Sequence, residues 1–325
     1  MPKVIPLRPI AFVFVLFLFP VLAGSVQGQQ HTVLDFEPTV GAPAYRRGGG
    51  PIVLIDEGHH NFHTLGPTTD YDDAHRQVTI PGRYGPFAEL LRRDGYVVRS
   101  LRSPFHPAAL ADAQVLVIAN ALAEANIDAW SLPNPSAFAD DEIEVIVTWV
   151  RAGGALLLVA DHQPWPAAAA GLAERFGLLF YTGSTERLQF RREIGSLQDH
   201  PITRGRGLAE QIDFVLTFGG QAFRFAGDIT GDPLLIIPLN TTLVLHWDPF
   251  PDLTDKVFRI RADGMLQGPT VRFGAGRVAA FGEAAMFTAQ VDEEGPMGMN
   301  HPEAPQNAQF VLNVLHWLTE VLPEH

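Results

Sequence analysis

The sequence contains no cysteine. A chain without thiols forms no disulfides and offers no thiolate nucleophile, so its stability must come from its core. Cationic residues are also scarce: 23 Lys and Arg stand against 36 Asp and Glu, a formal net charge of −13. We therefore expect neither nucleic acid nor anionic lipid as a partner, because both require basic surface.

Several catalytic and nucleotide-binding motifs are absent as well. No Walker loop and no Gly-x-Gly-x-x-Gly sequence follows an expected strand, which removes the support for nucleotide binding. No Gly-x-Ser-x-Gly elbow of a serine hydrolase occurs. Beyond residue 28 no apolar run is long enough to cross a bilayer. What remains is a chain of 325 residues, 46% hydrophobic, that can bury a sizeable core.

The first residues have the layout of a secretory signal peptide. Lys3 and Arg8 precede an apolar run (10–22), and small residues follow it through Gly28. This order predicts a signal peptide over residues 1–28. An uncleaved membrane anchor is the competing interpretation, but the run is short for a span.

Cleavage is expected after Gly28, with Ser25 as the alternative. It would leave 21 Lys and Arg against 36 Asp and Glu, a formal net charge of −15. Because no cysteine follows the apolar run, a lipoprotein anchor is excluded. We expect a periplasmic or extracellular protein that is free of the membrane once the signal is removed.

Residues 29–50 are polar and end in "RRGGG", which indicates a flexible lead-in. Beyond it, apolar strands alternate with helices, and residues 210–275 are typical of strands and turns. Strands are predicted at 51–56, 96–101, 113–120, 155–160 and 277–285, and helices at 84–95, 140–154, 165–177 and 305–322. The pattern predicts one α/β domain over 51–325: a flavodoxin-like three-layer sandwich with a largely parallel sheet and a β-rich excursion.

Polar side chains gather where the predicted strands end. In such sheets ligands bind beyond the carboxyl ends of the strands, although polar residues are also expected at any exposed strand end. The catalytic candidates are Asp161, His162 and Glu283. The candidates for ligand binding are Asp56, His59, His60, Asn61 and Asn120, with Asn300 and His301 further out.

A divalent metal is one use for these residues. Histidines and carboxylates suit zinc or manganese, and His59, His63, His162 and Asp161 are the candidate ligands. His59 and His63 are four residues apart, but Gly58 and Asn61 indicate a loop rather than the helix of a known zinc signature. The sequence leaves the metal open.

Several stretches resemble the class I glutamine amidotransferase-like superfamily. They are "VLIDEGHHNFH" at the first strand, "ADAQVLVIAN" at the third, and the helix–strand unit "VTWVRAGGALLLVADHQ". "DHPITRG" (199–205) and "GRVAAFGE" (276–283) also match. Within the superfamily the chain is most similar to trehalose-utilisation (ThuA-like) proteins and to a group of secreted amidotransferase-like domains. The resemblance covers residues 51–320 and implies the fold more strongly than the function.

In true amidotransferases the corresponding strand leads to a nucleophilic cysteine, and here Asp161 and His162 stand at that place. Glutamine hydrolysis through a thioester is therefore excluded. "HPE" (301–303) resembles the amidotransferase His-Pro-Glu, but it precedes the last helix instead of following a strand.

Three functions stay open at this point. The first is an exported domain that binds a small polar ligand or glycan, for which the resemblance and the signal peptide argue. The second is a hydrolase, either metal-assisted or driven by the Asp161–His162 pair with Glu283. The third is an interaction scaffold without catalysis. The oligomeric state does not follow from the sequence.

Overall fold

The structure is a computed structural model that describes residues 31–32, 36–71, 77–229, 231–246, 257–292 and 295–323. The predicted signal peptide lies outside these residues, so export stays a prediction. Within the described ranges, no helix is long and apolar enough to cross a membrane.

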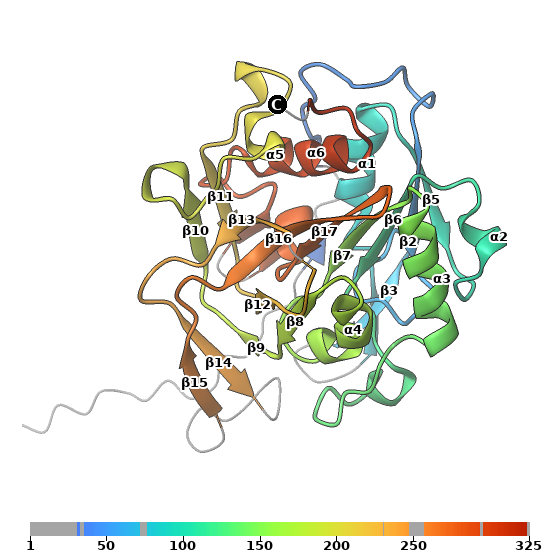
Figure 1. The fold of residues 1–325 in the computed structure, drawn as a ribbon, viewed down its shortest axis with the longest axis vertical. Coiled ribbons are helices and arrows are strands. Elements are labelled where there is room, and N and C mark those ends of the chain that lie inside the picture. Colours follow the sequence, from blue (N-terminus) through green and yellow to red (C-terminus); the bar gives the residue numbers. More distant parts are fainter. Residues whose placement is uncertain are drawn as a thin grey trace, which may run out of the picture.

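A nine-stranded sheet forms the centre of the molecule (Figure 1). Its parallel half consists of β2 (Ile52–Asp56), β5 (Val97–Leu101), β6 (Val115–Ala119), β7 (Ala155–Val159) and β17 (Gly276–Phe281). These strands lie in the order β5-β2-β6-β7-β17, and each neighbouring pair is parallel. Counted along the chain this is 2-1-3-4-5, the flavodoxin-like order, which confirms the predicted fold class.

The other half of the sheet is antiparallel. It consists of β8 (Leu178–Tyr181), β12 (Ala222–Phe225), β13 (Asp232–Ile236) and β16 (Leu266–Phe273). β16 pairs with β17 and continues the sheet to β12 and β8, while β13 also pairs with β16. Most of this half comes from the predicted β-rich excursion, which here extends the central sheet.

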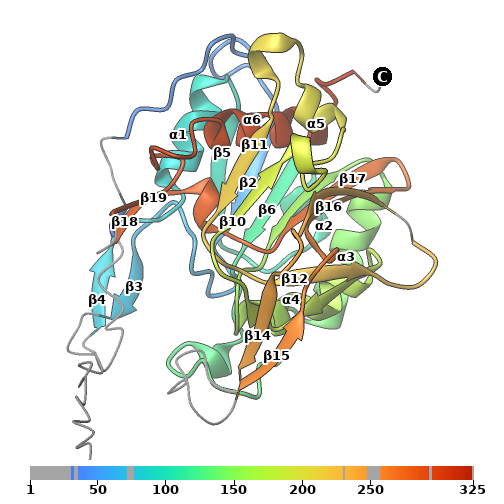
Figure 2. The same ribbon diagram turned by 90° about the vertical axis from the view of Figure 1, so that its left-hand side faces the viewer.

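Helices cover both faces of the sheet and so make three layers. α1 (Gly85–Arg93) and α6 (Asn307–Leu318) lie on one face, and α3 (Asp140–Arg151) and α4 (Trp165–Glu174) on the other (Figures 1 and 2). Two short helices, α2 (Pro107–Leu110) and α5 (Pro201–Arg204), lie in connections. The four longer helices match the predicted ones to within a few residues at each end.

Successive side chains of a strand point to opposite faces of the sheet, so the central sheet has a hydrophobic core on each face. Val115 and Val117 of β6 pack in the core on the α1 and α6 side, whereas Leu116 and Ile118 pack in the core on the α3 and α4 side. Every residue of β6 and β7 is buried. Strands that are covered on both faces have to be apolar throughout, which is why these segments appear as continuous apolar runs in the sequence.

Smaller sheets and single turns of 3₁₀ helix complete the fold. The remaining strands are β1 (His31–Thr32), β3 (Thr68–Tyr71), β4 (Gln77–Ile80), β9 (Gly183–Ser184), β10 (Leu188–Arg191), β11 (Phe214–Thr217), β14 (Thr242–His246), β15 (Val257–Arg261), β18 (Ala289–Asp292) and β19 (Gly295–Gly298). The 3₁₀ turns are η1 (Glu124–Asn126), η2 (Arg192–Ile194), η3 (Leu208–Glu210) and η4 (Ala285–Phe287).

The stretch "DHPITRG" contains a buried histidine that caps a helix. The Nδ1 atom of His200 accepts a hydrogen bond from the Ile202 backbone N–H at the start of α5, at 3.1 Å. Its Nε2 atom lies 3.2 Å from the hydroxyl of Thr270. Burial lowers the pKa of His200 to about 4, because the charged ring would lose its water. This histidine is therefore neutral at physiological pH.

We expect His200 to make the fold acid-sensitive. The unfolded chain binds the proton of His200 below about pH 6.5, whereas the folded chain binds it only near pH 4. Protonation between these two pH values therefore favours the unfolded chain, and the free energy of unfolding falls as the pH is lowered through that range. From pH 7.5 to 4.5 the loss should be about 2 kcal/mol larger in the wild type than in His200→Asn, whose amide can cap α5 without titrating. Urea unfolding of both proteins at pH 7.5 and 4.5 measures this difference in the free energy of unfolding. Equal losses in the two proteins would contradict the conclusion that His200 is buried and neutral.

Candidate functional site

The four predicted strand ends meet at one edge of the sheet, called here the carboxyl edge. Asp56 ends β2, Asn120 follows β6, Asp161 follows β7, and Glu283 follows β17. All four side chains are buried. Since β2, β6, β7 and β17 are parallel neighbours, the polar groups that follow them are brought together although they are far apart in the sequence.

At β2, His59 is held between two carboxylates. Its Nδ1 atom lies 2.9 Å from Asp56 Oδ1, and its Nε2 atom lies 3.0 Å from Glu142 Oε1 on α3. The amide of Asn61 donates to Asp56 Oδ2 at 3.0 Å. The ring stacks on Phe105, with centroids 4.4 Å apart. These contacts fasten the loop after β2 to the first turn of α3.

Both ring nitrogens of His59 are thereby engaged. Burial disfavours a charged imidazole, but the hydrogen bonds and charges of Asp56 and Glu142 outweigh that effect and raise the pKa of His59. The neighbouring His60 is exposed and has a positive φ of 49°. The structure therefore places His59 inside a closed hydrogen-bonded group and His60 at the surface.

At β6, Asn120 connects the loop after β2 to the end of β7. It adopts a φ of 52°, a left-handed conformation that asparagine tolerates better than most residues. Its side-chain oxygen accepts the backbone N–H of Asp161 at 2.9 Å, and its amide nitrogen lies 3.1 Å from Nδ1 of His63. Burial, together with the charges of Arg83 and His162, holds the pKa of His63 well below its usual value. His63 is accordingly neutral.

Asp161 and Glu283 form a buried carboxyl pair at the ends of β7 and β17. Asp161 accepts the backbone N–H groups of His162 at 2.7 Å and Ala284 at 3.0 Å. Glu283 accepts those of Ala285 at 2.6 Å and Met286 at 2.9 Å. Backbone donors around the two strand ends thus substitute for the water that burial removes.

The pair carries an unusual charge state. Burial raises the pKa of Glu283 well above its ordinary value, and the charge of Asp161 raises it further, against the hydrogen bonds from Met286 and Ala285. Burial also raises the pKa of Tyr84 well above 10, and Glu283 and Asp161 add to that rise. Glu283 therefore keeps its proton to a higher pH than an exposed glutamate does.

Three polar atoms near this pair are buried and have no hydrogen-bond partner within the described ranges: Tyr84 Oη, Trp165 Nε1 and Gln221 Oε1. Gln221 is fixed beside the pair, because its side-chain nitrogen donates to the Ala160 carbonyl at 2.6 Å and its backbone N–H to Gly282 at 2.8 Å. Buried polar atoms are normally paired, so these three are exceptions among the described residues.

Aromatic side chains border the carboxyl pair. Phe62, Trp130 and Trp165 contact one another with ring centroids 5.1–5.4 Å apart. The ring of His162 lies 4.8 Å from that of Trp165, and His63 connects Phe62 to Tyr84. His162, Phe62 and Trp130 are half-buried. This aromatic group therefore extends from the buried pair to the surface.

The two outer candidates, Asn300 and His301, contact different parts of the chain. Asn300 donates to the Gln290 carbonyl at 2.9 Å, and the side chain of Gln290 accepts from Arg83 at 3.2 Å. The ring of His301 packs on Phe218, with centroids 5.3 Å apart, and the backbone of Phe218 bonds to Glu283. Both are half-buried, and their predicted role in binding stays a prediction.

Sequence reasoning missed several members of this site. From the sequence, Tyr84 and Glu142 are included only as members of the predicted helices 84–95 and 140–154, and Trp130 and Gln221 are not singled out. A metal remains a prediction: in the described part of the chain no three His, Asp or Glu side chains are grouped so that they could hold an ion.

Comparisons with known proteins support the fold. No family model matches the chain. No curated protein matches it either. Among solved structures, the mmIFT52 N-terminal domain is similar with a TM-score of 0.52 and 12% identity over 82% of this chain and 97% of that one. At that identity the likeness shows the fold alone.

Two proteins described as ThuA-like are also similar. The one from Parabacteroides merdae has a TM-score of 0.45 and 11% identity over 85% of this chain and 92% of that one. The one from Bacteroides uniformis has a TM-score of 0.42 and 12% identity over 87% and 94%.

Removing the unpaired hydroxyl of Tyr84 should not cost stability. An unpaired buried hydroxyl costs about 1–3 kcal/mol, so we expect Tyr84→Phe to raise the free energy of unfolding by about 1 kcal/mol. Tyr96, whose hydroxyl lies 2.9 Å from that of Thr319, is the matched control, and Tyr96→Phe should lower it. Urea unfolding of the wild type and both variants measures these changes in the free energy of unfolding. A clear loss of stability in Tyr84→Phe would mean that its hydroxyl is paired in the folded protein.

Proposed function

We propose that the carboxyl edge binds a polar, hydroxyl-rich ligand of the carbohydrate class without thiol chemistry. The observation that carries the proposal is the set of unpaired buried polar atoms beside the carboxyl pair. Trp165 Nε1 can only donate, Gln221 Oε1 can only accept, and the Tyr84 hydroxyl can do both. Sugar hydroxyls also donate and accept, so a mixed set of this kind suits them.

The aromatic group supports the same ligand class. Flat apolar rings next to a few fixed polar groups are typical of small-molecule sites, and the rings of Phe62 and Trp130 reach the surface there. Phe62 also carries the guanidinium of Arg83 over its ring, 3.9 Å from the centroid, which fixes its orientation. The C–H faces of a sugar ring can pack on such rings while its hydroxyls meet the polar atoms.

Tryptophan fluorescence gives a direct test, because Trp130 and Trp165 belong to the aromatic group. We expect saturable changes with one or more members of a panel of neutral mono- and oligosaccharides. Asp161→Asn and Trp130→Ala should each weaken binding tenfold or more, a loss of about 1.4 kcal/mol. Asp112→Asn, an exposed aspartate before β6 at the opposite edge of the sheet, should leave it unchanged. A panel without any binder would end the carbohydrate assignment.

The carboxyl pair also favours hydrolysis as a second candidate function. A buried acid with a raised pKa beside a second carboxyl group is typical of acid–base catalysis. Here a protonated Glu283 would donate to the leaving group, and Asp161 or His162 would accept the proton of the attacking water. The metal-assisted version of this hydrolase stays a prediction.

If the protein is a hydrolase, its turnover should fall as the pH rises through the raised pKa of Glu283, because the donor is lost. Glu283→Gln should abolish turnover of aryl glycosides while the affinity for a ligand found in the fluorescence screen stays within about threefold. Asp112→Asn again serves as the control. Unchanged turnover in both Asp161→Asn and His162→Ala would exclude this chemistry.

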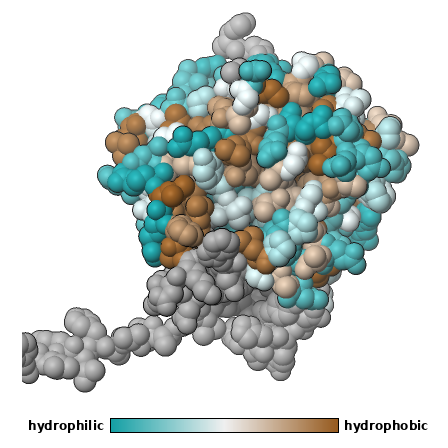
Figure 3. All heavy atoms as spheres, turned by 60° about the horizontal axis from the view of Figure 1, so that its bottom comes forward, coloured by the Kyte–Doolittle hydropathy of each residue, from teal (hydrophilic) through white to brown (hydrophobic). Residues whose placement is uncertain are grey.

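The third function, an interaction scaffold, has less support. The exposed large hydrophobic side chains of the described residues are distributed over separate elements; they include Ile194, Leu208, Leu239 and Phe258. In the view of Figure 3, hydrophobic residues likewise reach the surface in small groups between hydrophilic ones. A docking site for another protein usually presents a larger continuous apolar patch.

A further inference from the structure

The loop that connects β6 to α3, called here the β6–α3 loop (residues 122–139), starts and ends at the same pair of residues. Its first backbone N–H group, that of Leu122, donates to the carbonyl of His59 at 2.9 Å. Its last, that of Ala139, donates to Glu142 Oε2 at 3.0 Å. The ring of His59 lies 3.0 Å from Glu142 Oε1, so the two residues that fasten the loop are also bonded to each other. Both ends of the loop therefore lie beside the carboxyl edge.

One buried side chain holds the middle of this loop together. Among residues 124–136, Asn126 alone is buried, with 2% of its surface exposed. Its side-chain nitrogen donates to the carbonyls of Ala129 at 2.8 Å, Ser131 at 3.3 Å and Pro133 at 3.2 Å. No apolar side chain is buried in that range, so the amide of Asn126 takes the place of a hydrophobic core.

These hydrogen bonds fix the backbone that carries Trp130. Two of the three carbonyls belong to the residues on either side of Trp130, and the side-chain nitrogen of Asn134 donates to the Trp130 carbonyl itself at 3.1 Å. The Trp130 ring centroid lies 5.4 Å from that of Phe62 and 5.1 Å from that of Trp165. Without these bonds an exposed loop would adopt many conformations, and ordering it on binding would cost free energy.

We infer that Asn126 is a positioning residue for the carboxyl edge. Its amide fixes the backbone of the β6–α3 loop so that the Trp130 ring stands against Phe62 and Trp165 before a ligand arrives. A ligand that packs on this preformed wall binds without having to order the loop, which increases its affinity. The effect on binding rests on the proposed function, whereas the placement of Trp130 does not.

The first test removes the donor and keeps the shape of the side chain. Asn126→Asp sets a carboxylate against three carbonyl oxygens, because an aspartate has only acceptors. Acrylamide quenching of tryptophan fluorescence measures the exposure of Trp130, as the difference between each protein and its Trp130→Phe derivative. We expect the quenching constant of Trp130 to rise about threefold or more in Asn126→Asp, because the loop opens locally. Should this variant fail to fold, Asn126→Ala removes the same donor without adding charge, and the same rise is expected.

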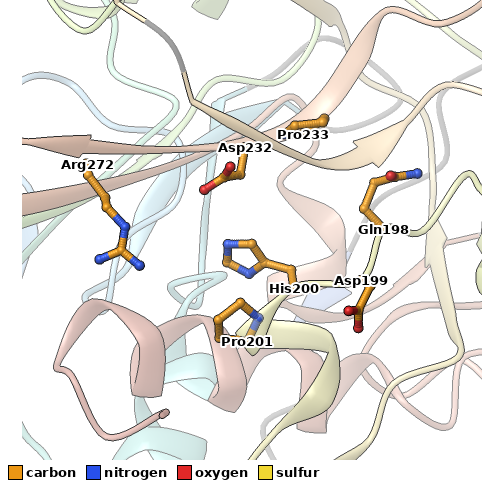
Figure 4. Close-up of a pocket in the computed structure, with 7 residues that line it drawn as sticks. All are labelled: Gln198, Asp199, His200, Pro201, Asp232, Pro233 and Arg272. Atoms are coloured by element: carbon orange, nitrogen blue, oxygen red, sulfur yellow. The ribbon is translucent and has the colours of Figure 1, made fainter. Parts of the chain in front are cut away.

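Asn313→Asp is the matched control, with Asn313→Ala beside Asn126→Ala. Asn313 is also a buried asparagine, and its side-chain nitrogen donates to the carbonyls of Ile202 and Glu210, both at 2.8 Å. Ile202 follows Pro201, which lines a separate pocket beside α5 (Figure 4). The control removes a similar set of hydrogen bonds outside the β6–α3 loop, so the quenching of Trp130 should stay at the wild-type value. Urea unfolding midpoints show that each variant is folded.

Cellobiose and maltose, titrated by tryptophan fluorescence, provide the binding readout. We expect Asn126→Asp to weaken the binding of a disaccharide that the wild type binds by about fivefold or more, and Asn313→Asp to leave it unchanged.

Three results would overturn the inference. They are wild-type quenching of Trp130 in Asn126→Asp, an equal rise in Asn313→Asp, and unchanged affinity of Asn126→Asp for a disaccharide that the wild type binds. If neither disaccharide binds the wild type, that result counts against the proposed function, and the quenching of Trp130 alone decides whether Asn126 positions it.

Discussion

The burial of two carboxyl groups at the ends of neighbouring strands is the constraint on which the carboxyl edge depends. Asp161 and Glu283 are at most 9% exposed, and a lone buried carboxylate is costly. Backbone N–H groups of residues 162 and 284–286 donate hydrogen bonds to the two carboxyl groups, and the raised pKa of Glu283 favours its neutral form. Both effects offset the free-energy cost of burial. Close approach of the backbones is required too: a Cβ on Gly220, whose φ is +93°, would lie 2.0 Å from the Gly282 carbonyl oxygen.

The parallel half of the fold could be predicted because its strands are buried on both faces. "AQVLVIAN" and "ALLLVA" show that burial directly as continuous apolar runs, and the amphipathic helices between them have clear ends. The antiparallel half could not be placed in the same way. β8 and β12 have four residues each, and they pair across more than 40 residues of chain, so no local pattern reports which sheet they join.

Only part of the candidate site could be predicted from the sequence. Residues that directly follow buried strands, such as Asp161 and Glu283, could be found from the strand ends alone. Their partners could not, because the contacts span large separations: His59 and Glu142 are 83 residues apart, and Gln221 and Ala160 are 61 apart. Tyr84 precedes a helix and has no local signal of function, since its importance comes from burial beside two acids.

The protonation of Glu283 is the measurement that tests this account most directly. As the pH rises above the range in which an ordinary glutamate loses its proton, Glu283 should still carry its own, because its pKa is raised. The infrared difference spectrum between the wild type and Glu283→Gln should then show the carbonyl band of a protonated carboxylic acid in the wild type alone. If the difference shows the bands of an ionised carboxylate instead, Glu283 is an ordinary buried anion held by its backbone donors, and the acid–base and binding roles of the carboxyl pair lose their basis.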